Sequence, residues 1–149
     1  SALVERRSIQ YRRHLTLLGV ARSELDSASA RVEAALRRCL DDPHGRWLLA
    51  PHRDGHSEFV VQVNGAATAH QYRIDRTFID ADGTRWIVDY KVGLHEGSDL
   101  AAYLESELNR YRPQLQRYGE AMRLLEDRPV KLGLYFPLHA RFLSWAYES

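Results

Sequence analysis

An aspartate and a lysine end an apolar stretch at residues 87–93, which read IVDYKVG. Ile87 and Val88 suit a buried strand. Burial of the charged Asp89 and Lys91 side chains costs free energy, so their presence there suggests a function. Side chains alternate along a strand, so Asp89 and Lys91 point to one face. This pair suits metal-assisted hydrolysis, in which the lysine orients a water or neutralises charge that grows on a phosphate. The alternative is a solvated strand edge with an ordinary surface ion pair.

A second aspartate joins this pair in one of two possible hairpin registers. The stretch FIDADGTRW connects two expected strands. A two-residue Asp82–Gly83 turn would set Asp75 opposite Tyr90. A three-residue loop, with Gly83 in the left-handed conformation, would set Asp75 opposite Asp89. Two adjacent carboxylates repel each other, and a hard cation such as Mg²⁺ or Mn²⁺ would compensate them.

The elements that must position these residues alternate between helix and strand. Helices are expected over residues 2–18 and 28–40, the second capped by Asp26 or Ser27. Residues 99–126 are also expected to be helical, with a break near Pro113. This order predicts an α/β or α+β domain with a mixed sheet flanked by helices, in the order α-βββ-α-β(β). The expected strands are residues 58–63, 70–79, 84–91, 130–137 and 141–147.

Composition limits the classes of protein that the chain fits. The 149 residues, 44% hydrophobic and 28% charged, suit one globular domain with a substantial core. The net charge of +1 points to no partner by itself. Cys39 is the single cysteine, so a disulfide framework is excluded and the cytoplasm is the expected compartment. No membrane association is expected, because no apolar run is long enough to span one.

Residues 73–93, RIDRTFIDADGTRWIVDYKVG, resemble the signature of PD-(D/E)XK nucleases. The likeness is greatest to the branch fused to helicases of the RecB and AddA type. In that superfamily a hairpin carries one acid, and the next strand carries an acid-x-Lys element. These positions fall here on Asp75, Asp89 and Lys91. The resemblance implies a restriction-endonuclease-like core in which Asp75 and Asp89 bind Mg²⁺ or Mn²⁺ and Lys91 assists catalysis.

A helical element extends the resemblance. The branch carries a Gln-x-x-x-Tyr element that falls on Gln114 and Tyr118 of RYRPQLQRY. The two residues lie on one helix face, where they either contact a phosphate or the attacking water, or pack on the sheet. Glu58 matches a glutamate that opens the first strand in this branch and is expected to help at the metal. The backbone carbonyl of Tyr90 is expected as a further ligand, as in other members of the superfamily.

The resemblance also implies a biological setting. It suggests the exonuclease domain of a bacterial, cytoplasmic, ATP-dependent helicase–nuclease that processes DNA ends in double-strand break repair and recombination. Expected partners are single-stranded DNA or a duplex end, the helicase motor of the same full-length protein, and a partner subunit. No G-x-x-x-x-G-K-[ST] loop is present, so ATP would act at a motor outside this chain.

One departure from the family pattern keeps other functions open. The branch carries a metal-binding histidine in a Gly-x-x-x-His context on an early helix, and His14, in YRRHL, does not match it. Residues 1–25 are therefore expected to be a helical segment cut from a longer chain, with the nuclease core at 26–149. Such a fragment would hold metal weakly. The alternatives are a non-catalytic DNA-binding or docking module, and a stand-alone endonuclease of the same fold.

Overall fold

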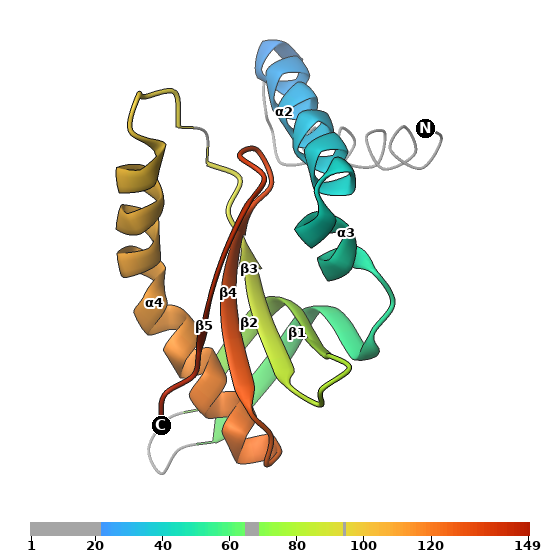
Figure 1. Ribbon diagram of the computed structural model, residues 1–149, viewed down its shortest axis with the longest axis vertical. Coiled ribbons are helices and arrows are strands. Elements are labelled where there is room, and N and C mark those ends of the chain that lie inside the picture. The colour runs from blue at the N-terminus through green and yellow to red at the C-terminus, as the bar shows by residue number, and fades with distance from the viewer. Residues whose placement is uncertain (1–21, 65–68, 94) are drawn as a thin grey trace.

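The structure is a computed structural model that describes residues 22–64, 69–93 and 95–149. Two helices precede three strands, then a long helix and two further strands follow (Figure 1). Apart from the short second helix, this is the order that the sequence predicts for the described residues. The helix expected over residues 2–18 lies outside the described residues. The elements are α2 (Arg22–Asp41), α3 (Pro43–Leu49), β1 (Arg53–Asn64), β2 (Ala69–Ile79), β3 (Arg85–Tyr90), α4 (Leu100–Leu125), β4 (Val130–Phe136) and β5 (Arg141–Ala146).

The five strands form one mixed sheet in the order β1-β2-β3-β4-β5. Neighbouring strands run antiparallel except β3 and β4, which are parallel. A parallel pair needs a long crossover connection, and α4 provides it. The mixed sheet expected from the sequence is therefore confirmed.

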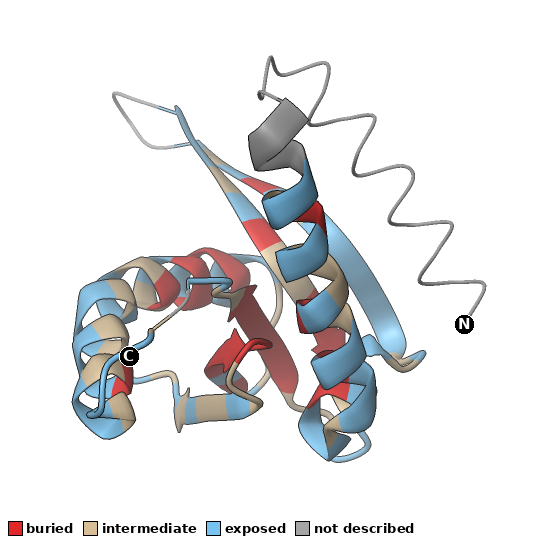
Figure 2. Cartoon of the chain, turned by 90° about the horizontal axis from the view of Figure 1, so that it is seen from above, coloured by how far each residue is buried: buried red, intermediate tan, exposed pale blue. Residues whose placement is uncertain are grey.

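Helices cover both faces of this sheet, so the domain has three layers (Figure 1). On the α4 face, Leu115 packs in a core with Ile87 and Leu132. On the α3 face, Leu48 packs in a second core with Phe78. The buried residues lie on the sheet and on the inward sides of the helices (Figure 2). The fold is α+β, with a five-stranded mixed sheet flanked by helices.

α4 is continuous where the sequence predicts a break. It runs through Pro113 without interruption, so that prediction is wrong. A proline removes one backbone hydrogen bond from a helix, but packing on the sheet compensates, since Leu104, Leu115 and Tyr118 are all buried. Figure 1 shows α4 changing direction about halfway along its length, as a proline inside a helix causes.

α2 is longer than the sequence predicts. The expected cap residues Asp26 and Ser27 lie inside the helix, so the predicted start is wrong. Both residues are exposed there, and an exposed helix face tolerates short polar side chains. Ala35 and Cys39, four residues apart, are buried, and Cys39 packs in the core on the α3 face.

α3 lies between the helix expected at 28–40 and the strand expected at 58–63, where the sequence predicts no helix. Asp42 caps it, because its Oδ2 accepts a 3.0 Å hydrogen bond from the Gly45 amide. The same oxygen accepts a 2.9 Å hydrogen bond from the Tyr135 hydroxyl, which ties α3 to β4. None of the helices in the described ranges is long and apolar enough to span a membrane.

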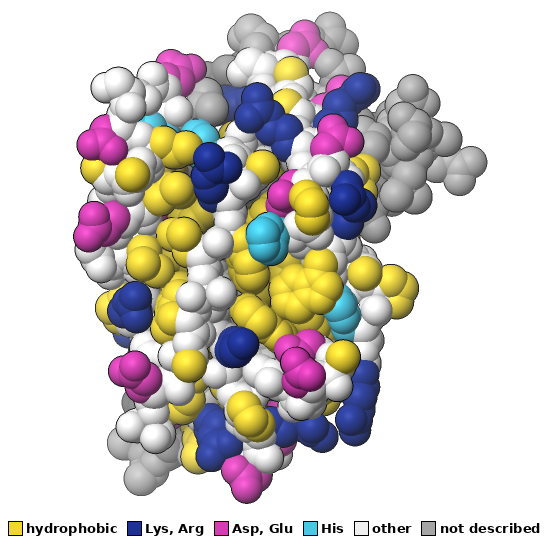
Figure 3. All heavy atoms as spheres, viewed as in Figure 1, with side chains coloured by type: hydrophobic (Ala, Val, Ile, Leu, Met, Phe, Trp, Pro, Cys, Tyr) yellow, Lys and Arg dark blue, Asp and Glu magenta, His cyan; other side chains and the backbone are white. Residues whose placement is uncertain are grey.

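β5 is an edge strand whose side chains alternate between the two cores. Phe142 packs against the core on the α3 face, whereas Leu143 and Trp145 pack against the core on the α4 face. Figure 3 shows hydrophobic side chains on both sides of this strand. β5 therefore contributes side chains to the cores on both faces of the sheet.

Candidate metal centre

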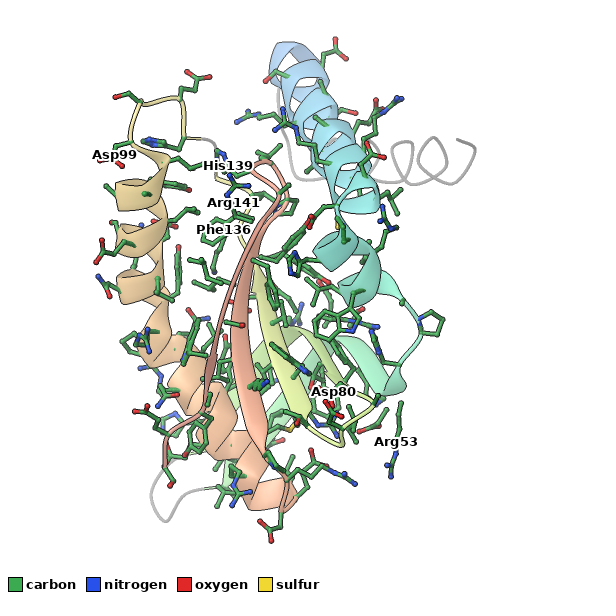
Figure 4. The ribbon with its side chains drawn as sticks, in the orientation of Figure 1. Arg53, Asp80, Asp99, Phe136, His139 and Arg141 are labelled. Carbon is green, nitrogen blue, oxygen red and sulfur yellow. The ribbon has the colours of Figure 1, made fainter. Side chains whose placement is uncertain are left out.

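The acid and lysine positions gather where β3 ends. Because β3 and β4 are parallel, the end of β3 lies at the same edge of the sheet as Phe136, the last residue of β4. Figure 4 shows Phe136 and His139 at this edge, and Asp80 of the β2–β3 turn at the opposite end. In open α/β sheets the carboxyl ends of parallel strands are common locations for binding sites.

The hairpin between β2 and β3 adopts the register that brings the aspartates together. Asp80 donates its amide to the Thr84 carbonyl at 3.0 Å, which closes a three-residue loop. Gly83 has φ +80°, the left-handed conformation that this loop requires. The last pair of the ladder on this side is Arg76 with Val88, and Asp75 and Asp89 follow it directly, close enough for their charges to interact. Of the two registers that the sequence allowed, the three-residue loop is therefore confirmed.

The strand pairing of β2 with β3 ends at Arg76, just before Asp75. The Tyr90 amide donates a 2.9 Å hydrogen bond to Asp75 Oδ2, so the side chain stands in for a strand carbonyl. The strand also twists here, since Ile74 packs in the core on the α4 face and Phe78 in the core on the α3 face. On β1, Glu58 lies opposite Asp75 with φ +54°, an irregular backbone that accompanies the twist. Asp75 is thus fixed beside the end of β3.

Asp89 is a buried acid with only 4% of its surface exposed. Burial raises the pKa of its carboxyl, and the negative charge of Asp75 raises it further. The Lys91 ammonium opposes both effects, because its Nζ lies 3.1 Å from Asp89 Oδ2. One buried carboxylate therefore has a cation on one side and a like charge on another. A further cation beside the two carboxylates would lower their energy.

Lys91 lies just past β3, held by its backbone and by an aromatic ring. Its amide donates to the Tyr135 carbonyl at 2.8 Å. Its Nζ lies 3.6 Å from the centre of the Tyr111 ring on α4. Sequence reasoning missed Tyr111, although the residue lies three positions before Gln114 and seven before Tyr118. That spacing puts all three on one helix face, which was the available signal.

Gln114 and Tyr118 are brought together on the sheet-facing side of α4. Gln114 Nε2 donates a 2.5 Å hydrogen bond to the Tyr118 hydroxyl. Tyr118 is buried in the core on the α4 face, and its ring centre lies 5.5 Å from that of Tyr72. Tyr118 thus packs on the sheet, as one of the sequence interpretations required, and Gln114 is joined to it by that hydrogen bond. Contact with a phosphate stays a prediction.

Glu58 and Tyr90 are placed differently from the carboxylate pair. The Glu58 side chain is exposed and lies 3.7 Å from the Arg73 guanidinium, so the structure pairs it with that arginine. The Tyr90 ring packs against the core on the α3 face, where burial raises the pKa of its hydroxyl to about 12. The Tyr90 backbone, by contrast, lies between Asp89 and Lys91 in the chain, and the role of its carbonyl as a ligand stays a prediction.

The chemistry of the donors fits a hard divalent cation. Among the described residues, no group of three or more acidic, histidine or cysteine side chains is arranged to hold a metal. The side-chain donors here are the carboxylate oxygens of Asp75 and Asp89. Oxygen donors suit Mg²⁺ and Mn²⁺, which also keep several waters when bound.

Similarity to known proteins gives little information about the function of this chain. No protein-family model matches the chain, and no curated protein matches it. A solved structure described as "Crystal structure of SSO0001" aligns with 96% of this chain at 13% identity and a TM-score of 0.38. The aligned region spans 62% of that structure's chain. A likeness this low assigns neither fold family nor function.

Proposed function

We propose that this chain is a metal-dependent DNA nuclease domain that hydrolyses phosphodiester bonds. The observation that carries the proposal is the pair of adjacent carboxylates, Asp75 and Asp89, with the Lys91 ammonium 3.1 Å from Asp89. Adjacent like charges in a buried setting are unfavourable for stability. Such an arrangement is characteristic of sites that bind ions or perform chemistry.

Each residue has a distinct task in the proposed reaction. Asp75 and Asp89 would hold Mg²⁺, with the Tyr90 carbonyl as a further ligand. The ion would polarise the phosphodiester and make water a better nucleophile at neutral pH. The Lys91 ammonium would orient the attacking water or stabilise negative charge on the phosphate oxygens. Gln114 would present its amide to a phosphate oxygen, with its orientation set by the hydrogen bond to Tyr118.

The PD-(D/E)XK fold is the family assignment that we propose. The three strands before α4, the crossover to the parallel β4, and the acid on a hairpin beside an acid-x-Lys strand all support it. The Gln-x-x-x-Tyr helix faces the same side of the sheet, since Tyr118 and Ile87 share one core. These features are consistent with the resemblance carried by residues 73–93 and 110–118.

The larger protein follows from the resemblance alone. By that likeness, the domain belongs to a bacterial, cytoplasmic helicase–nuclease that trims DNA ends during double-strand break repair and recombination. A motor domain that uses ATP would feed a single strand to the site as an exonuclease substrate. A partner subunit is part of the same proposal.

One observation favours a different function, that of a non-catalytic DNA-binding or docking module. The described residues place two carboxylates at the site, and Glu58 pairs with Arg73 instead of joining them. The ion pair between Asp89 and Lys91 also satisfies part of the charge without any metal. A stand-alone endonuclease of the same fold is the third candidate, and it would cut circular DNA without ATP.

Cleavage of DNA by matched variants tests the proposal. Wild type, Asp89→Asn and the control Asp82→Asn, which changes an exposed acid in the hairpin loop, would be incubated with linear single-stranded DNA and Mg²⁺ or Mn²⁺. We expect cleavage by wild type and control, none with chelator, and a loss of about a thousandfold in Asp89→Asn. Equal cleavage by wild type and Asp89→Asn would contradict the proposal. DNA binding by wild type without cleavage would favour the docking module.

A further inference from the structure

The Lys91 ammonium has two attractive neighbours of different kinds. Asp89 Oδ2 lies 3.1 Å from Nζ, and the centre of the Tyr111 ring lies 3.6 Å from it. The lysine side chain is 17% exposed, so both contacts are largely shielded from water. An ammonium over an aromatic face is attracted by the ring quadrupole, and shielding strengthens the attraction.

α4 holds the Tyr111 ring in this position. Leu115, four residues later, is fully buried against the sheet and fixes the rotation of the helix. The Arg110 guanidinium also approaches the Tyr111 ring, but at 5.5 Å, and its side chain is 71% exposed and lies 3.9 Å from Glu107. Lys91 is therefore the closer and more shielded of the two cations at this ring.

The two neighbours of Lys91 respond differently to a bound metal. A divalent cation on Asp89 would take up the carboxylate charge that now attracts the ammonium and would repel the ammonium as a like charge. A lysine has four rotatable bonds and a strongly hydrated head, so it would then favour solvent. The Tyr111 ring carries no charge to share with the metal, so its attraction for the ammonium would persist.

We propose that Tyr111 is a positioning residue of the nuclease site, whose ring keeps the Lys91 ammonium at the reacting phosphate when Asp89 is engaged by the metal. This inference rests on the proposed function. The aromatic ring, not the tyrosine hydroxyl, does the holding. Tyr111→Phe should therefore keep the positioning role, whereas Tyr111→Leu should lose it.

Kinetics of single and double variants separate this role from simple packing. We expect Tyr111→Phe to cleave within about twofold of wild type, and Tyr111→Leu to lose about tenfold in kcat with little change in KM. In a Lys91→Met background, Tyr111→Leu should cause no further loss, because its effect passes through the lysine. Tyr103→Leu, on the same helix but stacked on His95, is the control and should show equal losses in both backgrounds. Equal losses from Tyr111→Leu in both backgrounds would overturn the proposal.

A nuclear magnetic resonance measurement tests the same contact without any cleavage. Ring currents shift the ε-methylene signal of a lysine that lies over an aromatic face, and Lys91→Met identifies the signal. We expect the shift in wild type and Tyr111→Phe to persist when Mg²⁺ is added, and Tyr111→Leu to show a solvent-like position. Loss of the shift in wild type on adding Mg²⁺ would overturn the proposal, even if DNA is cut. A persistent shift with no cleavage would place the failure in the nuclease function instead.

Discussion

Arg85, the first residue of β3, and Asp89, next to its last, are both buried charged side chains in opposite surroundings. Arg85 is 3% exposed and is met by two carboxylates. Asp89 is 4% exposed and is met by one lysine and one further aspartate. Arg128 lies 3.2 Å from Glu126, so the start of this six-residue strand has two cations for two carboxylates. Its end has one cation, Lys91, for two carboxylates.

At the start of β3, the charge of the Arg85 guanidinium is paired with side chains from distant segments of the chain. Glu126 accepts hydrogen bonds from Arg85 Nε at 2.5 Å and Nη2 at 3.1 Å. Asp54, in the bulged first part of β1 with φ +48°, turns its carboxylate to Nη2 at 2.5 Å. Burial lowers the pKa of the guanidinium, but these partners outweigh it and leave the pKa above its ordinary value. The arginine therefore stays charged and is matched.

The end of β3, in contrast, has more negative than positive charge. The pKa of the Asp89 carboxyl is raised by burial and by Asp75, so the folded state disfavours the charged form of this carboxyl. Locally consistent charges stabilise a fold, whereas unbalanced ones mark positions retained for another reason. The start of β3 serves stability, and its end serves the proposed chemistry.

The largest effect on stability should come from removing the arginine at the start of β3. Arg85→Leu would leave Asp54 and Glu126 facing an apolar group, and we expect it to lower the free energy of unfolding by about 3 kcal/mol. Urea denaturation measures this loss. Arg141→Leu, at an exposed position of β5, is the control and should lie within about 0.5 kcal/mol of wild type. If Arg85→Leu lowered the free energy of unfolding as little as the control does, a stabilising role for Arg85 with its two carboxylates would be contradicted.

A smaller effect should follow from removing one acid at the same end. Glu126→Gln removes the charge but keeps the shape, and we expect a loss of about 2 kcal/mol at neutral pH. The Arg85 hydrogen bond is the largest cause that lowers the pKa of Glu126, and burial opposes it. Its stabilising effect is therefore present above the unfolded pKa and lost as pH falls through the folded value. Denaturation at a series of pH values should show the two proteins converging in acid, and a difference that is constant with pH would argue against this origin.

The smallest effect should have the opposite sign. Asp75→Asn removes the like charge beside Asp89 while keeping an oxygen for the Tyr90 amide. Without metal we expect it to stabilise the fold by up to about 1 kcal/mol at neutral pH. Because the pKa of Asp89 is raised, wild type loses stability as pH rises through that pKa, so the gain should appear above it and vanish below it. Loss of stability in Asp75→Asn at neutral pH would show that the end of β3 is also optimised for folding.

Much of the fold could be predicted from local patterns. Runs rich in β-branched and aromatic residues mark all five strands, and the order of elements follows from them. The boundaries of the helices were less accessible. Asp26 and Pro113 are strong local signals that tertiary packing overrides, because α2 and α4 gain more from burial than a cap or a break would give.

The candidate site could be predicted only in part. Asp75, Asp89 and Lys91 follow from alternation along the strands once the hairpin register is known, but the sequence allowed two registers. The cluster around Arg85 depends on Asp54 and Glu126, which are 31 and 41 residues away in the chain. The contribution of Tyr111 could be predicted only if the rotation of α4 on the sheet were known. Contacts of this kind arise from packing between elements, and no local pattern encodes them.

Calorimetric titration of Mn²⁺ into the metal-free protein tests most directly whether the end of β3 is a metal site. Wild type, Asp75→Asn and the hairpin control Asp82→Asn would be compared at neutral pH. We expect wild type and control to bind the ion equally, and Asp75→Asn to bind it about a hundredfold more weakly. Equal binding by wild type and Asp75→Asn would contradict the assignment of the two carboxylates as the metal centre.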